Sequence, residues 1–191
     1  TGSLIQDGNG NVLLDVPGVS AGGDIQLTGA LRVGQDLRLV ADQTWIGSTI
    51  DSVDGGTYDL VFDSRLRTEI GGAVGQSNLL GSLVTGTTGD MIIYATEVST
   101  REDQRYNVPL TFAQTQVASE LKLSSQSSDI EFASTVSAGL NAKGMQRSLR
   151  VEALEGNVFV RGLIGVSLAD VMFRDYASAI DTNPYGLIVT A

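Results

Sequence analysis

The chain has 191 residues, of which 42% are apolar and 6% aromatic, and its formal net charge is −10 at pH 7. This acidic balance argues against a nucleic-acid partner, because neutralising phosphates requires clustered Lys and Arg, and against attachment to an anionic membrane surface. The sequence contains no Cys and no His, which excludes disulfides, a Cys/His zinc site, a thiolate nucleophile and a Ser-His-Asp relay.

A three-residue pattern, apolar–x–apolar, recurs along the chain and predicts short β-strands of about three to five residues. Side chains alternate in a strand, so the two outer residues share one face and the middle residue points the other way. In several copies the middle residue is charged or polar, and we expect that face to contact water. In chain order the copies are 25–27, 31–33, 37–39, 60–62, 110–112, 121–123, 130–132, 149–151, 158–160 and 187–189.

One stretch of the chain repeats after 28 residues. Aligning 121–136 with 149–164 gives every apolar position an apolar partner: Leu121 falls on Leu149, and Val136 falls on Ile164. The match extends over two strands and the turn between them. It favours a solenoid, in which each coil stacks on the next, over an antiparallel, lectin-like sandwich.

A helix is an alternative over 111–123, where Phe112, Val117 and Leu121 share one face of a helical wheel. Elsewhere β-branched residues and 23 glycines disfavour long helices.

The longest wholly apolar run, 91–95, is too short to cross a bilayer, so we expect no membrane insertion. We therefore predict an all-β β-solenoid of short stacked strands.

Residues 71–112 resemble repeats of very large bacterial exoproteins of the filamentous haemagglutinin and autotransporter type. The similarity lies in Val74-Gly75, in Leu83 after a Leu pair, and in the apparent strands 98–100, 104–106 and 110–112. Residues 148–165 look like the next portion of such a repeat, and the likeness covers about 58–175. The resemblance implies a right-handed parallel β-helix in a secreted, surface-attached rod, and it supplies no catalytic residues. We expect 1–191 to be a single solenoid segment of a longer repeat protein.

Two groups of acidic and amide residues are candidate calcium sites. Asp7, Asn9 and Asn11 alternate as in a calcium loop, but Val12 and Gly18 stand where an EF-hand needs Gly and a bidentate acid, so a plain turn is preferred. Asp51, Asp54 and Asp59 lie near a Gly pair. Clustered carboxylates of this kind bind calcium or act as acid and base on a polysaccharide. A solvated loop in an acidic protein is the preferred interpretation, because nothing in the sequence pairs these acids with a defined partner. We therefore assign no catalytic, cofactor or metal residue and expect no cofactor.

Charged and aromatic residues provide weaker indications. The mixed charges of Arg101, Glu102, Asp103 and Arg105 are typical of an exposed corner. Trp45 and the Tyr residues are candidates for stacking on sugar rings, although scattered single aromatic residues are commonly part of the core or of a neutral surface. The middle-position cations, if stacked, would form a basic row that blocks edge pairing; they are Arg32, Arg38, Lys122 and Arg150.

These observations favour a non-enzymatic structural or adhesive segment of an extracellular or cell-surface bacterial exoprotein. Its expected partner is an unidentified host or cell-surface receptor or a glycan, together with further coils of the parent chain. The alternative is a β-helix lyase or hydrolase that acts on polysaccharides through surface carboxylates.

Overall fold

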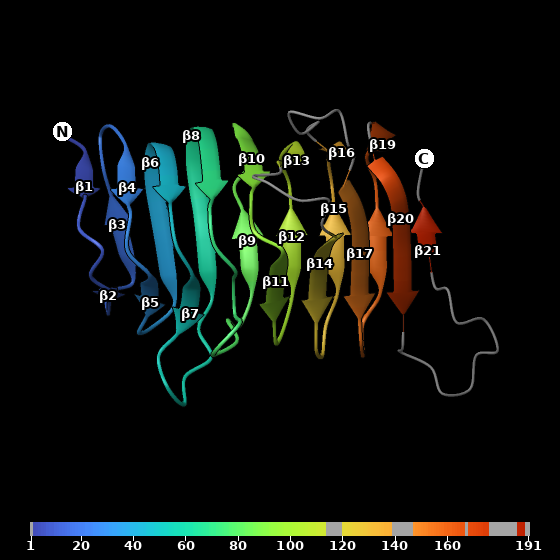
Figure 1. Ribbon diagram of the computed structural model, residues 1–191, viewed down its shortest axis with the longest axis horizontal. Helices are drawn as coiled ribbons and strands as arrows, with labels where there is room; N and C mark the ends of the chain where they lie inside the picture. The colour runs from blue at the N-terminus through green and yellow to red at the C-terminus, as the bar shows by residue number, and fades with distance from the viewer. Residues whose placement is uncertain (1, 114–119, 139–146, 167, 176–186, 190–191) are drawn as a thin grey trace.

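The computed structural model describes residues 2–113, 120–138, 147–166, 168–175 and 187–189, and this part of the chain contains strands and no helix. The strands form an elongated parallel β-solenoid, with the N-terminus at one end and the C-terminus at the other (Figure 1). Every strand pairing in it is parallel. The predicted solenoid is confirmed and the antiparallel sandwich is wrong; right-handedness stays a prediction.

Each coil contributes strands to three faces. The first face holds β1 (Leu4–Gln6), β4 (Ile25–Leu27), the second halves of β6 (Leu37–Ile46) and β8 (Leu60–Ile70), β10 (Asp90–Ile93), β13 (Leu110–Phe112), β16 (Val136–Ala138) and β19 (Ile164–Val166). The second holds β2 (Val12–Leu14), β5 (Leu31–Val33), β7 (Ile50–Ser52), β11 (Glu97–Thr100), β14 (Glu120–Ser125), β17 (Arg147–Ala153) and β20 (Leu168–Asp175), with Val74 bridging β7 and β11. The third holds β3 (Gly18–Ser20), the first halves of β6 and β8, β9 (Leu83–Thr85), β12 (Gln104–Tyr106), β15 (Ile130–Phe132), β18 (Val158–Val160) and β21 (Leu187–Val189).

All ten apolar–x–apolar elements lie within strands, and the 28-residue match is the true coil register. Leu121 pairs with Leu149, Ile130 with Val158 and Val136 with Ile164. The offset is not constant, however. It is only 19 residues between Leu31 and Ile50, because loops of different length join the strands. This variation is why the coils at the N-terminal end show no regular period in the sequence.

The core is a continuous column of side chains stacked from coil to coil. Leu37 lies on Leu60, which lies on Leu83, and each is at most 2% exposed. Alternation places the middle residue of each strand outside, as predicted. Arg38 and Val61 each lie between two buried residues of their strand and are not themselves buried. The apolar faces of successive coils therefore form one hydrophobic core.

Five of the described strands are longer than the predicted three to five residues: β14 has 6 residues, β17 has 7, β20 has 8, β6 has 10 and β8 has 11. The last two are the longest because the chain passes from the third face to the first without a Gly or Pro to end the strand. A buried hydroxyl chain fills this corner: Thr68 Oγ1 donates to Ser64 Oγ, which donates to Thr44 Oγ1, both at 2.9 Å. The register of β6 on β8 shifts at the same corner.

The proposed helix over 111–123 does not form as a whole. Residues 111–112 end β13 and 120–123 begin β14, and 114–119 lie outside the described residues. The described residues include no helix long and apolar enough to cross a membrane.

The stacked core predicts opposite outcomes for two neighbouring residues of β8. Phe62→Ala removes a ring that is 1% exposed and should lower the free energy of unfolding by about 3–5 kcal/mol. Val61→Ala, on the half-buried outer face, should cost below about 1 kcal/mol. Urea denaturation followed by circular dichroism measures both. Equal losses would contradict the assignment of inner and outer faces.

Candidate functional site

The three acids of the predicted carboxylate cluster each bind a neighbouring coil. Asp51 is 5% exposed, and its Oδ1 accepts the backbone N–H groups of Ser77 at 2.8 Å and Asn78 at 3.1 Å. Asp54 is exposed and pairs with Arg32 at 2.8 Å. These contacts order the loops between coils. Across the described residues no group of three or more acids is arranged to hold a metal ion.

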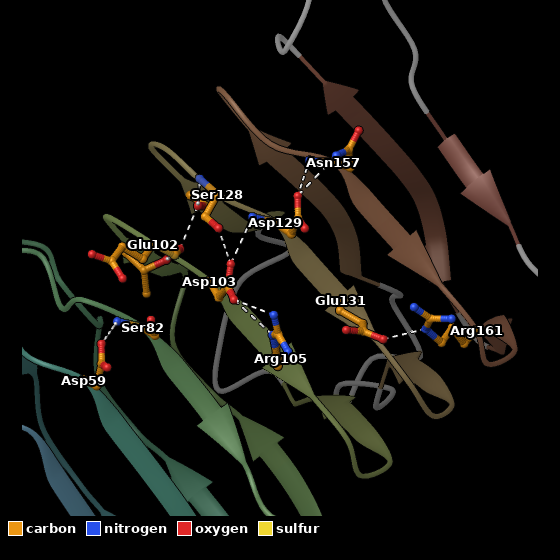
Figure 2. A network of polar contacts seen from close by, with 12 residues as sticks. Asp59, Ser82, Glu102, Asp103, Arg105, Ser128, Asp129, Glu131, Asn157 and Arg161 are labelled. Atoms are coloured by element: carbon orange, nitrogen blue, oxygen red, sulfur yellow. Dashed lines mark hydrogen bonds and ion pairs between the residues drawn. The ribbon is translucent and has the colours of Figure 1, made fainter.

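The third acid, Asp59, belongs to a column of polar residues that follows one corner of the solenoid, just before the third face. Asp59 N donates to Asp36 Oδ1 at 3.0 Å, and Asp59 Oδ1 accepts from Ser82 N at 2.8 Å. Three coils after Asp59, Asp129 Oδ1 accepts from Asn157 N at 2.8 Å. Four carboxylates at this corner, those of Asp36, Asp59, Asp103 and Asp129, each accept a hydrogen bond from a backbone N–H group of the next coil, and Figure 2 shows the last three. Ser82 and Asn157 occupy the same position in their coils, and we call these six residues the corner ladder.

The residues of the corner ladder share a position in the sequence that predicts where they lie, although they were not among the predicted site residues. Each member directly precedes the first residue of a strand segment on the third face, as Asp36 precedes Leu37 and Asp129 precedes Ile130. The 28-residue alignment already placed Asn157 on Asp129. An Asp or Asn before an apolar–x–apolar element therefore marks four members of the ladder, Asp36, Asp59, Asp129 and Asn157, whereas Ser82 and Asp103 do not fit this pattern.

Asp103 has the most contacts in the ladder. Its carboxylate accepts from the Ser128 hydroxyl, from Arg105 Nη2 at 2.7 Å and from Asp129 N at 3.3 Å (Figure 2). Burial raises the pKa of this carboxyl, but the Ser128 hydrogen bond and the Arg105 guanidinium outweigh it, so the pKa lies below its ordinary value. The corner at 101–105 is exposed at Arg101, Glu102 and Arg105, as predicted, and Asp103 also joins it to the next coil.

A second polar network begins at two buried residues of the same coil, Gln104 and Tyr106. Tyr106 Oη donates to Gln104 Oε1 at 2.9 Å, while Gln104 Nε2 donates to Ser124 O at 2.8 Å. The Tyr106 ring stacks on Phe132 with centroids 5.4 Å apart. Burial raises the pKa of Tyr106, so the phenol stays protonated and serves as a donor inside the core rather than as a catalytic base.

The predicted calcium loop is organised by a protein side chain. Gln6 Oε1 accepts from the N–H groups of Thr28 and Gly29, both at 3.0 Å, and Gln6 Nε2 donates to Gly8 O. Thr28 Oγ1 also donates to Gly8 O at 2.8 Å. The Gly8 carbonyl oxygen thus accepts hydrogen bonds from two protein side chains. This arrangement fits a plain turn, the interpretation preferred from the sequence.

The four middle-position cations do not form one basic row. Only Lys122 and Arg150 are neighbours in register, whereas Arg32 lies beside Asp51 and Arg38 is on a different face. Each pairs with acids: Lys122 Nζ lies 3.6 Å from Glu152, Arg150 Nη2 lies 2.7 Å from the same carboxylate, and Arg38 contacts Asp63. Lys122 and Arg150, although adjacent and of like charge, share the carboxylate of Glu152, which offsets their mutual repulsion.

Shallow grooves indent the described surface, and three of them have well-defined linings. One, of about 220 Å³, lies on the first face over β4, β6 and β8 and contains Trp45. A second, of about 280 Å³, lies on the second face around Lys122 and Ser99. The third, of about 260 Å³, contains Arg101 and the Gly55-Gly56 loop. Trp45, a candidate for stacking on a sugar ring, is thus the aromatic residue in the lining of the groove on the first face.

No protein-family model matches the chain, and neither curated proteins nor solved structures give a match. The β-solenoid fold therefore stands on the geometry of the chain itself.

The corner ladder predicts how stability depends on pH. Because the folded pKa of Asp103 is below its ordinary value of 3.8, its contribution is complete above about pH 4 and is lost as pH falls through the lowered pKa. Asp103→Asn should cost about 1 kcal/mol at pH 7, and this difference from the unmodified protein should shrink below about pH 4.

Urea denaturation at a series of pH values measures the difference. Asp7→Asn is the matched control, since Asp7 lies in an exposed loop, and it should leave the free energy of unfolding unchanged. A difference for Asp103→Asn that stays constant down to pH 2 would show that its carboxylate is not what joins the coils.

Proposed function

We propose that this chain is a non-enzymatic structural and adhesive segment of a bacterial exoprotein of the filamentous haemagglutinin or autotransporter type, located outside the cell or on its surface. The observation that carries the proposal is the parallel stacking of coils into a rod with one continuous core. In a rod of this kind each coil adds about 4.8 Å along the axis, so the number of coils sets the length of the rod.

The use of the acidic residues supports a scaffold. Asp51 and Asp59 accept backbone hydrogen bonds from neighbouring coils, and such side chains hold geometry rather than activate a water molecule. Ion pairs join successive coils on the outer surface, as in the bidentate contact of Arg67 with Asp90 at 3.0 and 3.1 Å. Individually such exposed pairs contribute about 0–1 kcal/mol, but they repeat along the rod.

Adhesion and particle shape can be measured on the purified chain. Small-angle scattering should give an elongated particle, and beads coated with the chain should adhere to epithelial cells more than beads coated with a globular protein of similar net charge. We expect adhesion to survive Asp51→Asn and Asp59→Asn where the variants remain folded.

The competing enzymatic function has a distinct outcome. Release of new reducing ends from polysaccharides by the purified chain, abolished by Asp54→Asn, would overturn the proposal in favour of a β-helix hydrolase. Formation of an unsaturated sugar product would instead indicate a lyase. Cell binding no greater than that of the control beads would remove the adhesive part and leave the scaffold.

A further inference from the structure

We propose that the groove around Trp45 binds a neutral oligosaccharide, which would make it the recognition surface of the adhesive rod proposed above. The groove lies on the outer side of the first face, where β4, β6 and β8 follow one another along the rod (Figure 1). Its lining residues are Asp24, Ile25, Gln26, Gln43, Thr44, Trp45, Arg67 and Glu69.

Parallel register brings the outward side chains together from three coils. Trp45 is paired with Gln26 on one side and with Glu69 on the other. Gln43, two residues before Trp45, is paired with Arg67. Adjacent strands are about 4.8 Å apart, so the indole has a polar side chain next to it on both neighbouring strands. Residues more than 40 positions apart in sequence thus form one surface.

The indole of Trp45 lies along its own strand over Gly47. A Cβ added at Gly47 would lie 2.6 Å from Cη2 and 2.7 Å from Cζ2 of the ring, so a side chain there would displace the indole. Trp45 remains partly exposed. Glycine at 47 therefore allows the ring to lie close to the backbone as a flat apolar surface.

The groups around this ring retain unused hydrogen-bonding capacity. Within the described part of the chain, the side chains of Asp24, Gln26, Gln43 and Trp45 make no hydrogen bond, and both Gln residues are exposed. An amide side chain offers donors and an acceptor, which matches hydroxyls that also do both. A sugar ring has an apolar C–H face for the indole and a rim of hydroxyls for these groups. A flat aromatic ring with convergent polar groups is the usual composition of a small-molecule site.

The charges of the groove select among sugars. Its lining contains two carboxylates, Asp24 and Glu69, and one guanidinium, Arg67, which is already held by Asp90 at 3.0 Å. The groove therefore has no free cation to receive a uronate or sialate carboxylate, and its own acids repel one. A neutral oligosaccharide fits this surface, and an acidic one does not.

The other two grooves lack this combination. In the groove on the second face, Lys122 pairs with Glu97 and Glu152, and Ser99 hydrogen-bonds to Ser124 at 2.8 Å. The lining of this groove contains no aromatic residue. The groove beside Arg101 has no aromatic residue in its lining.

Binding can be followed through the protein's own fluorescence, because Trp45 is its single tryptophan. Titration with cellohexaose and with N-acetylchitohexaose should give a saturable change in emission with a dissociation constant of about 1 mM or lower for at least one of them. Trigalacturonate should bind at least about tenfold more weakly.

Calorimetry on variants separates the groove from the rest of the surface. Trp45→Ala should reduce affinity by about tenfold or more and Gln43→Ala by a few-fold, with unchanged circular dichroism. Leu13→Ala, which truncates an apolar side chain that is 60% exposed on the second face, should bind as the unmodified protein does. Absence of a saturable signal for both neutral sugars, equal affinity of Trp45→Ala, or preference for trigalacturonate would each overturn the inference. The rod proposed above is tested separately by scattering, so failure of sugar binding leaves it standing.

Discussion

Parallel hydrogen bonding between successive coils is the constraint on which the rest of this structure depends. Once β8 lies beside β6 in register, Leu60 must sit on Leu37 and Val61 must sit beside Arg38. The parallel pairing of strands therefore determines both which side chains stack in the core and which side chains line up on the outer surface. A single coil orders some 20 residues while burying only a few apolar side chains, so its backbone entropy cost exceeds what it gains by itself. Stability comes from the contact between neighbours.

Polar side chains join the coils at the corners, where the backbone hydrogen bonds between parallel strands are interrupted. Loops of unequal length leave backbone N–H groups without a strand partner, and buried N–H groups without a partner are costly. Asp59 and Asp129 supply the missing acceptors. Gly81 assists at one corner, because a Cβ there would lie 2.4 Å from Asp59 Oδ1. The acidic character of the chain is thus partly structural, since several of its carboxylates hold one coil to the next.

Local pattern in the sequence predicts the strands well because each strand needs only two inward apolar residues. That requirement is visible at Ile25 and Leu27 as it is at Val158 and Val160, and all are buried. The 28-residue match also predicts the register of β14 on β17. It succeeds there because two neighbouring coils happen to have similar loops.

The site is less predictable because it depends on register between coils. Trp45, Gln26 and Glu69 are 19 and 24 residues apart, and no single period relates them. The long strands β6 and β8 were also missed, since nothing local indicates that a strand will continue round a corner. The row of cations was a wrong prediction for the same reason: position within a strand is local, but the neighbour in the next coil is not.

Cross-linking tests the register most directly, since the chain has no cysteine of its own. Val61 and Val84 are paired on the outer side of β8 and β9, where adjacent Cα atoms are about 4.8 Å apart, within the range that a disulfide spans. The doubly substituted Val61→Cys/Val84→Cys protein should form an intramolecular disulfide under mild oxidation, detected by mass. The pair shifted by one residue, Val61→Cys/Leu83→Cys, should not, because Leu83 is buried in the core. Efficient cross-linking of the shifted pair in place of the first would contradict the stacking of coils described above.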